Sequence, residues 1–370
     1  MTEWKECTIA DIGTVVGGAT PSTKDPSNYD GGEIAWITPK DLSNYEDRYI
    51  SHGERNITEK GLNGCSAQLM PKHSVLFTSR APIGYVAIAD GEVCTNQGFK
   101  SVVPNKNTDY LFLYYLLRYN KDKIEGLGSG TTFKEVSGST MRGIKVRVPT
   151  TLSVQKAIGR FLDSIDCKIE QNRKINKNLL EQAQAIYSDM FITNANPLWP
   201  TGHLSDLITV RYGKDHKKLA DGVYPVYGSG GIMRYAERPL YDKESVLIPR
   251  KGTLNNVVYV NEPFWSVDTM FFTEMKLPNV AKFVFHFVKS KDLASLNAGS
   301  AVPSMTTDIL NAMELSIPDA DSLTKFETIV APMYRAIQQN TQESGKLAEL
   351  RDSLLPQLMS GELDVSELEL

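Results

Sequence analysis

Two long stretches of the chain carry apolar residues at helical spacing on a polar background. In the first stretch Ser153 is a candidate N-cap, and apolar residues follow at intervals of three and four up to Met190. A helix of that extent is a rod of roughly 55–60 Å at about 1.5 Å per residue. Its stripe consists of Val154, Ile158, Phe161, Ile165, Ile169, Ile175, Leu179, Ala183, Ile186 and Met190, with Asn172 as a polar interruption.

The second stretch repeats the first 168 positions further along the chain, without a gap. Its apolar pattern runs from Phe326 to Leu358, and we expect Pro332 and Pro356 to kink or break the helix. Two copies predict a duplicated unit, not a solenoid. The matching pairs are Leu162 with Val330, Ile165 with Met333, Ile169 with Ile337, Gln171 with Gln339, and Asn172 with Asn340.

Each predicted helix follows a region of short apolar segments bounded by Gly, Pro, Asn or Asp, which is typical of strands and turns. The predicted strands are residues 34–37, 75–78, 85–89 and 143–148, and then 225–227, 245–248, 257–260 and 312–317. Compact buried helices are predicted at 110–118 and near 280–289. The boundaries are 1–150 for the first domain, 151–193 for the first helical region, 194–318 for the second domain and 319–370 for the second helical region.

These elements predict an α+β protein in which two mixed α/β domains, related by pseudo-twofold symmetry, are separated by two long helices. An antiparallel coiled coil would bury both narrow stripes, with asparagines near its middle that cost stability but fix the register. The alternative is that each helix packs on its own domain. The predicted seam contains Ile165, Ile169, Asn172, Met333, Ile337 and Asn340.

Composition adds bounds but no function. A chain of 370 residues with 41% hydrophobic content can form two domains with cores of their own. The net charge is −4, and the acidity lies in residues 319–370, so the near-neutral domains permit a basic face without demonstrating one. Four scattered cysteines and the lack of a secretory or 18-residue apolar segment predict a cytoplasmic protein without membrane contact.

Catalytic motifs are not found in the sequence. There is no G-x-x-x-x-G-K-[ST] phosphate loop and no G-x-S-x-G nucleophile motif. The five histidines lack metal-ligand spacing. The NEPF tetrad at residues 261–264 lacks the first proline of the Asn-Pro-Pro-aromatic motif of amino-methyltransferases, and no glycine-rich cofactor loop precedes it. We therefore expect a non-catalytic chain that binds no metal or cofactor itself.

The chain resembles the specificity (S) subunit of type I restriction-modification systems over nearly its whole length. The domain openings "WKECTIADIGTVVGGATPST" and "WPTGHLSDLITVRYGK" carry the resemblance. The blocks "SRAPIG" and "TNQGFKSV" in the first domain, and "YPVYGSGGI", "VLIPRKGT" and "FWSVDTMFF" in the second, add to it, as does the helix ending "LRDSLLPQLMSGEL". Each block is weakly specific alone, but their order and duplication are typical of the family.

The resemblance implies that each domain reads one half of a bipartite, asymmetric double-stranded DNA site. It also implies that the helices act as a ruler and bind two methyltransferase (M) subunits. Those partners would bind S-adenosylmethionine and methylate adenine, and a restriction (R) translocase-nuclease using ATP and Mg²⁺ would complete the complex.

Candidate DNA-contacting residues follow from the chemistry of Arg and Lys with guanine or phosphate, and of Asn and Gln with adenine. Alternatively, Arg80 pairs with a nearby carboxylate, Asn96 and Gln97 only stabilise a turn, and Lys217 and Lys218 lie in a solvated loop. In the first domain the candidates are Arg80, Asn96, Gln97 and Lys100, with Thr131, Thr132 and Lys134 for phosphates. In the second they are Arg211, Lys214, Lys217, Lys218, Arg250 and Lys251, with Tyr227 and Ser229 in a turn that could approach a groove.

Two other classes of function remain open from the sequence alone. One is a non-catalytic coiled-coil adaptor whose domains bind peptide or carbohydrate. The other is a methyltransferase or nuclease with degenerate motifs, which would bind S-adenosylmethionine as an isolated chain. Salt-dependent binding to duplex DNA distinguishes the DNA reader from the adaptor.

Overall fold

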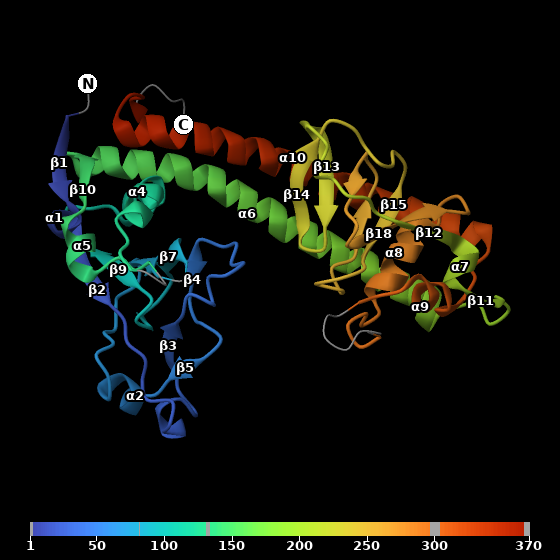
Figure 1. The fold of residues 1–370 in the computed structure, drawn as a ribbon, viewed down its shortest axis with the longest axis horizontal. Helices are drawn as coiled ribbons and strands as arrows, with labels where there is room; N and C mark the ends of the chain where they lie inside the picture. The colour runs from blue at the N-terminus through green and yellow to red at the C-terminus, as the bar shows by residue number, and fades with distance from the viewer. Residues whose placement is uncertain (1–2, 81, 131–133, 297–303, 366–370) are drawn as a thin grey trace. The chain divides into compact units, whose positions relative to one another are not determined.

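The computed structural model describes residues 3–80, 82–130, 134–296 and 304–365. The chain divides into two compact units, one formed by residues 1–173 with 341–370 and the other by residues 174–340. Two long helices, α6 (Leu152–Ser188) and α10 (Ala320–Ser360), contribute residues to both units (Figure 1). Each unit therefore contains a mixed α/β domain and a portion of each long helix.

The domain of the first unit is built on a five-stranded sheet of order β2-β9-β6-β7-β4, with a three-stranded sheet β5-β3-β8 and a strand pair β1-β10. Its strands are β1 (Trp4–Thr8), β2 (Gly13–Gly17), β3 (Ile34–Ile37), β4 (Tyr49–Ile50), β5 (Asn56–Ile57), β6 (Val75–Ser79), β7 (Ile83–Ala89), β8 (Val93–Thr95), β9 (Lys100–Pro104) and β10 (Lys145–Pro149). Its helices are α1 (Ile9–Ile12), the 3-10 turn η1 (Pro26–Asn28), α2 (Glu59–Asn63), α3 (Tyr110–Tyr119), α4 (Lys121–Gly126) and α5 (Gly138–Gly143).

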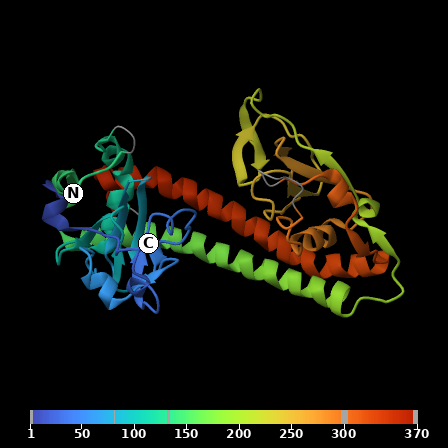
Figure 2. The same cartoon turned by 60° about the horizontal axis from the view of Figure 1, so that its bottom comes forward.

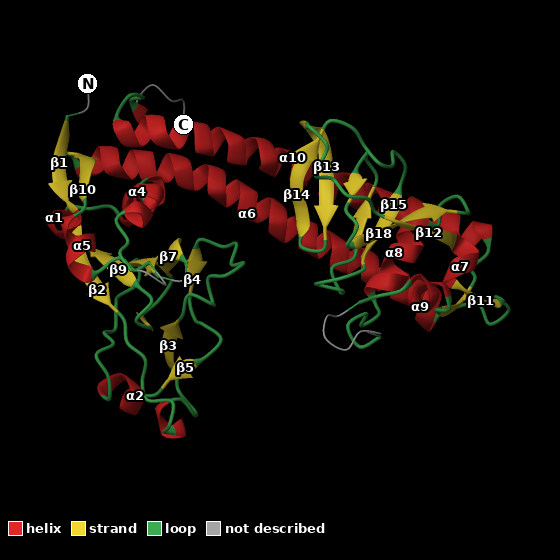
Figure 3. Cartoon of the chain, viewed as in Figure 1, coloured by secondary structure: helices red, strands yellow, loops and turns green. Residues whose placement is uncertain are grey.

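The domain of the second unit has a four-stranded sheet β12-β18-β15-β16, a three-stranded sheet β14-β13-β17 and a strand pair β11-β19 (Figure 3). Its strands are β11 (Thr201–His203), β12 (Ile208–Tyr212), β13 (Asp221–Gly228), β14 (Gly231–Ala236), β15 (Ser245–Pro249), β16 (Val258–Val260), β17 (Trp265–Ser266), β18 (Met270–Met275) and β19 (Glu314–Ser316). Its helices are the π-helical turn η2 (Asp189–Thr193), α7 (Leu204–Leu207), α8 (Ala281–Lys289) and α9 (Thr307–Asn311).

The two domains share one topology. In the larger sheets β2, β9, β6 and β7 occupy the order that β12, β18, β15 and β16 repeat. In the three-stranded sheets β3 pairs antiparallel with β5 and parallel with β8, and β13 pairs in the same two ways with β14 and β17. Even the short helices α1 and α7 share a capping box, closed by Asp11 and Asp206 respectively. The duplication inferred from the sequence is therefore confirmed at the level of strand pairing.

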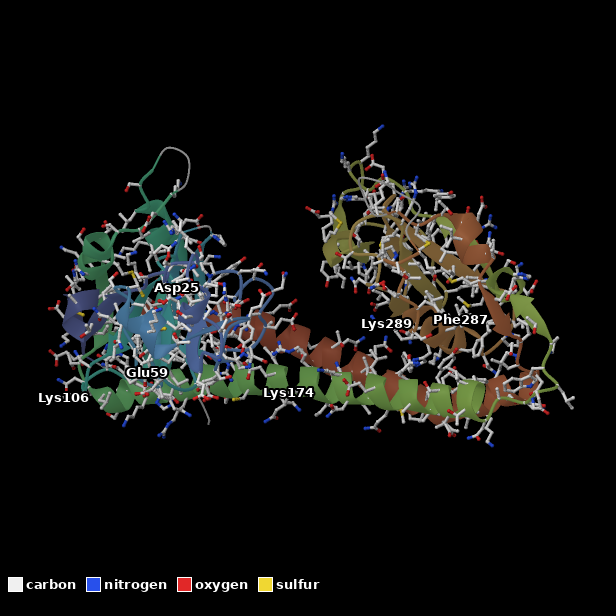
Figure 4. The ribbon with its side chains drawn as sticks, turned by 90° about the horizontal axis from the view of Figure 1, so that it is seen from below. Asp25, Glu59, Lys106, Lys174, Phe287 and Lys289 are labelled. Carbon is white, nitrogen blue, oxygen red and sulfur yellow. The ribbon has the colours of Figure 1, made fainter. Side chains whose placement is uncertain are left out.

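A buried helix lies between the larger sheet and the long helices in each unit. In the first unit α3 packs on β6 and β7, and its apolar residues share one core with Ile158 and Leu162 of α6 and Leu358 of α10. In the second unit α8 packs on β15 and β16 and shares a core with residues of the same two long helices. Figure 4 labels Phe287, which is buried on α8, and Lys289, which is exposed at the end of this helix. Burial on both sides explains why these helices are apolar all round.

The long helices run antiparallel within each unit. In the first unit Asn172 donates from Nδ2 to Ser344 Oγ at 3.2 Å and to Glu343 Oε2 at 2.7 Å. In the second unit Asn340 donates from Nδ2 to Asn176 Oδ1 at 2.8 Å. Residues 172 and 340 are repeat equivalents, as are 176 and 344, so the same polar contact is made twice. Each unit thus combines helix pairing with packing on its domain, which the sequence had presented as alternatives.

Most local predictions are confirmed, and several need correction. The predicted class, α+β with two mixed domains and long helices, is confirmed, and helices α3 and α8 lie where they were predicted. We expected Pro332 and Pro356 to kink or break the second helix, and the break is wrong, because α10 is helical without interruption from Ala320 to Ser360. The strand predicted at 143–148 begins instead at Lys145, and the short helix α5 that precedes it was missed, as was β14.

Candidate nucleic-acid interface

In the first unit, loops from distant parts of the sequence meet beside the ends of β2, β6 and β8. Ala19 N donates to Thr95 O at 3.0 Å, and Ser79 N donates to Gly98 O at 2.7 Å. These bonds assemble the first loop cluster, defined as residues 18–20, Arg80, residues 96–100 and residues 134–135. Gly18 lies so close to this loop that an added Cβ would be 2.1 Å from Asn96 O, so only glycine fits there.

A carboxylate holds two of the predicted cationic residues of the first loop cluster. Glu135 forms ion pairs with Arg80 at 3.6 Å and with Lys100 at 3.3 Å. The pairing of Arg80 with a carboxylate was the alternative considered from the sequence. The Arg80 side chain keeps 35% of its surface exposed, whereas Lys100 keeps only 15%.

The amide residues of the first loop cluster stabilise its turns. Asn96 Oδ1 accepts from Gly98 N at 2.8 Å, and Gln97 Oε1 accepts a hydrogen bond from the Thr20 hydroxyl. Lys134 is exposed. Thr131 and Thr132, which were predicted to contact phosphates, lie outside the described residues.

The second unit assembles an equivalent cluster at the same place in its topology. Lys214 N donates to Ser266 O at 2.8 Å, and Arg250 N donates to Thr269 O at 2.8 Å. The second loop cluster is defined as residues 212–218, 228–230, 250–256 and 266–269. Gly213 repeats the role of the first cluster's glycine, since an added Cβ would be 2.0 Å from Val267 O.

The cations of the second loop cluster have a different environment. The guanidinium of Arg250 stacks on the ring of exposed Tyr212 at 5.3 Å and donates to Asp268 O at 3.2 Å. Arg211, on β12, pairs with Glu274 at 3.0 Å. Four lysines of this cluster are exposed, and none has an ion pair within the described parts of the chain: Lys214, Lys217, Lys218 and Lys251.

The predicted turn residues are placed differently from one another. Tyr227 lies in the domain core, where burial raises the pKa of its hydroxyl and its ring packs edge-on against Phe264. Ser229 is half-buried, and its carbonyl accepts from Asn256 Nδ2 at 2.9 Å. This placement gives Tyr227 a packing role and leaves Ser229 at the surface of the turn.

Sequence reasoning missed several residues of the two clusters. Glu135 was not considered, because a carboxylate is not a candidate phosphate ligand and its partners are distant in sequence. Tyr212 and Thr20 were missed because their partners, Arg250 and Gln97, are also distant in the sequence. The glycines at the ends of β2 and β12 were a usable signal, since both copies carry one at the same place.

Among the predicted seam residues, Asn172, Ile337 and Asn340 make hydrogen bonds between the two long helices. Ile165 and Asn172 are buried within the first unit, and Ile169 is half-buried. Met333, Ile337 and Asn340 are half-buried within the second unit. Ile337 O also accepts from Asn176 Nδ2 at 3.4 Å.

Two other classes of site were sought among the described residues. No group of three or more His, Cys, Asp or Glu side chains within them is arranged to hold a metal ion. In the same part of the chain, no helix combines the length and the apolar character needed to cross a membrane.

Comparison with known protein families assigns the chain. The model of the type I restriction modification DNA specificity domain matches residues 1–181 and, a second time, residues 197–350. The chain belongs to this specificity-domain family. The two matches coincide with the two copies of the repeat, and each extends from a mixed domain into one of the long helices.

Relatives in the specificity family cover the chain almost completely. The MjaIX specificity subunit of Methanocaldococcus jannaschii is 32% identical over 99% of this chain and 95% of the relative. The EcoprrI specificity subunit of Escherichia coli is 21% identical over 87% of each. The crystal structure of a type I restriction-modification S subunit from M. genitalium aligns with a TM-score of 0.63 at 17% identity, covering 97% of this chain and 96% of that one. This last likeness establishes the shared fold.

Proposed function

We propose that this chain is the DNA-sequence specificity subunit of a type I restriction-modification complex. Each mixed domain reads one half of a bipartite, asymmetric double-stranded DNA site. The chain itself is non-catalytic, and it acts on genomic DNA in the cytoplasm.

The observation that carries this proposal is the duplicated loop cluster. The same strand topology presents, in each unit, one arginine immediately after the equivalent strand: Arg80 after β6 and Arg250 after β15. Arginine at a loop edge is suited to guanine or phosphate, and its neighbours differ between the copies. Two scaffolds of one topology with different loop residues fit two half-sites of different sequence.

The long helices supply the second part of the proposal. The family match extends from the domains into these helices, and the two helices are paired within each unit. We assign this surface to the binding of two methyltransferase subunits, and to restriction subunits where the system contains them. S-adenosylmethionine, ATP and Mg²⁺ are then cofactors of those partners.

Adenine-methylation mapping of a host genome tests the function directly. The chain is expressed with its neighbouring methyltransferase, and the map is compared with that of the same host lacking the chain. We expect a bipartite methylated motif that is lost on deletion. An unchanged map with a demonstrably active methyltransferase would favour the adaptor function, as would binding to duplex DNA that does not weaken with salt.

The spacing between half-sites tests the role of the helices as a ruler. Deleting one heptad from both α6 and α10 preserves the stripe on each helix while shortening the pair. We expect the methylated motif to keep both half-site sequences and to change the spacer between them. A variant that methylates the original sites at the original spacing would contradict the ruler function.

A further inference from the structure

The hairpin of β13 and β14 in the second unit exposes apolar side chains. Its strands lie side by side and are joined by Ser229 and Gly230, with Gly231 at a φ of +115° (Figure 2). Ile232 and Met233 follow this turn and are 50% and 59% exposed. These two residues are called the apolar tip.

Next to the turn, the exposed apolar side chains lie on β14, whereas β13 exposes Val223 at its far end. On β13, Val226 and Tyr227 are buried in a core with Phe264 and Trp265. In the sheet of order β14-β13-β17, β14 is an edge strand, and it has no further strand neighbour among the described residues. A firmly anchored strand therefore presents a second strand whose apolar tip lies in solvent, and exposed apolar patches with a polar rim are typical of interaction sites.

The apolar tip adjoins the second loop cluster, whose charge identifies the partner. The hairpin turn is itself part of this cluster, where Asn256 Nδ2 donates to Ser229 O at 2.9 Å. Val267 N donates to Tyr227 O at 3.0 Å on the other side of the turn. This cluster contains Arg250 and four exposed lysines against Asp215 and Asp268, so the apolar tip follows directly on a turn of a positively charged cluster, which fits a polyanion with apolar groups.

Duplex DNA has such groups in its major groove. The groove is about 12 Å wide and admits a two-stranded β-ribbon, and the C5-methyl group of thymine is its apolar feature. We propose that the β13–β14 hairpin enters the major groove of the half-site read by the second unit, where Ile232 and Met233 contact thymine methyl groups. The neighbouring cations bind the flanking phosphates. This inference rests on the proposed function and adds a base preference to it.

Uracil substitution isolates the proposed contact, because uracil pairs as thymine does but lacks the methyl group. The complex of the chain with its methyltransferase is titrated with duplexes of the mapped site in which each thymine of this half-site is replaced in turn. We expect binding to weaken about fourfold at one or two positions, the effect of losing one buried methyl-sized group. Ile232→Ser and Met233→Ser should weaken binding to the thymine duplex similarly and be indifferent to uracil at the contacted position.

Matched variants keep the test decisive. Val223→Ser lies on the same hairpin but far from the turn and is 77% exposed, so it should retain the wild-type response to uracil. Met233→Leu keeps an apolar group at the tip and should retain that response too. Uracil duplexes that bind as tightly as thymine duplexes, or a half-site without thymine, would overturn the inference while leaving the proposed function intact.

Two outcomes separate the remaining explanations. If the wild-type complex does not bind duplex DNA in a salt-dependent way, the proposed function itself is refuted. If Ile232→Ser and Met233→Ser bind DNA normally but fail to assemble with the methyltransferase, the apolar tip is a protein contact and the inference is wrong.

Discussion

The two units share strand pairing but differ in the connection between two paired strands of the three-stranded sheet. In the first unit the connection from β3 to β5 is long, and its Arg48 is buried against α6, where it pairs with Asp163 and Glu170. In the second unit the equivalent strands β13 and β14 are joined by two residues and the hairpin stays exposed. Shared strand pairing is thus compatible with one loop fixed to a helix and another left at the surface.

The contact between each buried helix and the long helices differs in the same way. In the first unit Tyr115 donates to Asp166 at 2.7 Å, and Asp166 also pairs with Arg351 at 2.5 Å. In the second unit the position of Tyr115 is occupied by His286, which accepts at Nε2 from the Tyr334 hydroxyl at 2.9 Å. At this equivalent position the first unit has a buried carboxylate and the second has a neutral imidazole, although Lys282 of α8 also pairs with Glu327 of α10 at 2.8 Å. Acid and mutations at this position should therefore act on the two units unequally.

The largest effect is expected from Arg48→Ala. Arg48 is 4% exposed, and its removal leaves the carboxylates of Asp163 and Glu170 without their cation. Breaking such a buried pair costs about 3–5 kcal/mol. Hydrogen exchange under mild denaturant should show this loss in the first unit alone. Arg173→Ala, which removes a more exposed pair with Glu46 and Asp47, should cost under about 1 kcal/mol, and equal losses would contradict the distinction.

The next effect is a pH dependence of the second unit. Burial lowers the pKa of His286 to about 4 from its ordinary value of 6.5. The unfolded chain therefore binds a proton between these values that the folded chain does not, so stability falls as the pH is lowered from 6.5 towards 4, by about 3 kcal/mol in all. Unfolding measured across this range by hydrogen exchange should show the slope in the second unit. His286→Asn should flatten it, and an unaltered slope would assign the titration to another group.

Arginine substitutions test whether the two loop clusters act independently. Arg80→Ala and Arg250→Ala each remove one candidate base or phosphate contact, worth about 1–3 kcal/mol if it is made to a base. We expect each variant to relax or weaken methylation at one half-site, and at a different half-site for the two variants. Methylation maps that change identically in both variants would show that the domains are not modular.

The smallest effect is expected from Glu135→Gln in the first loop cluster. In the proposed complex its carboxylate would compete with DNA phosphate for Arg80 and Lys100. The isolated bridge of Arg80 with Glu135 has a counterpart in the second unit between Lys251 and Ser304, which carries no charge. Removing this partly exposed charge should strengthen duplex binding a few-fold and steepen its salt dependence slightly. Glu274→Gln, next to Arg211, is the matched variant in the second unit. Weaker binding by Glu135→Gln would instead indicate that the carboxylate contacts a base.

Local pattern predicted the elements of the fold well. The stripe from Val154 to Met190 predicted α6, and the all-round apolar segment at 110–118 predicted α3, because helical spacing and burial are written in adjacent residues. The prolines of α10 were misleading, since the cost of each proline is local while apolar residues near both ends of the helix, such as Phe326 and Leu358, are buried in the two cores. For the candidate site, residue chemistry selected Arg80, Lys100 and Arg250, and strand topology then brought them to equivalent places.

The sequence by itself determined the duplication, the two long helices and the family, because each is a repeated or periodic pattern along the chain. Only the tertiary structure decided which side chains meet. Glu135 reaches Arg80, Arg48 reaches α6, and Ile232 is left exposed through pairings between residues far apart in the sequence. Such pairings depend on strand order and register, which apolar periodicity does not encode.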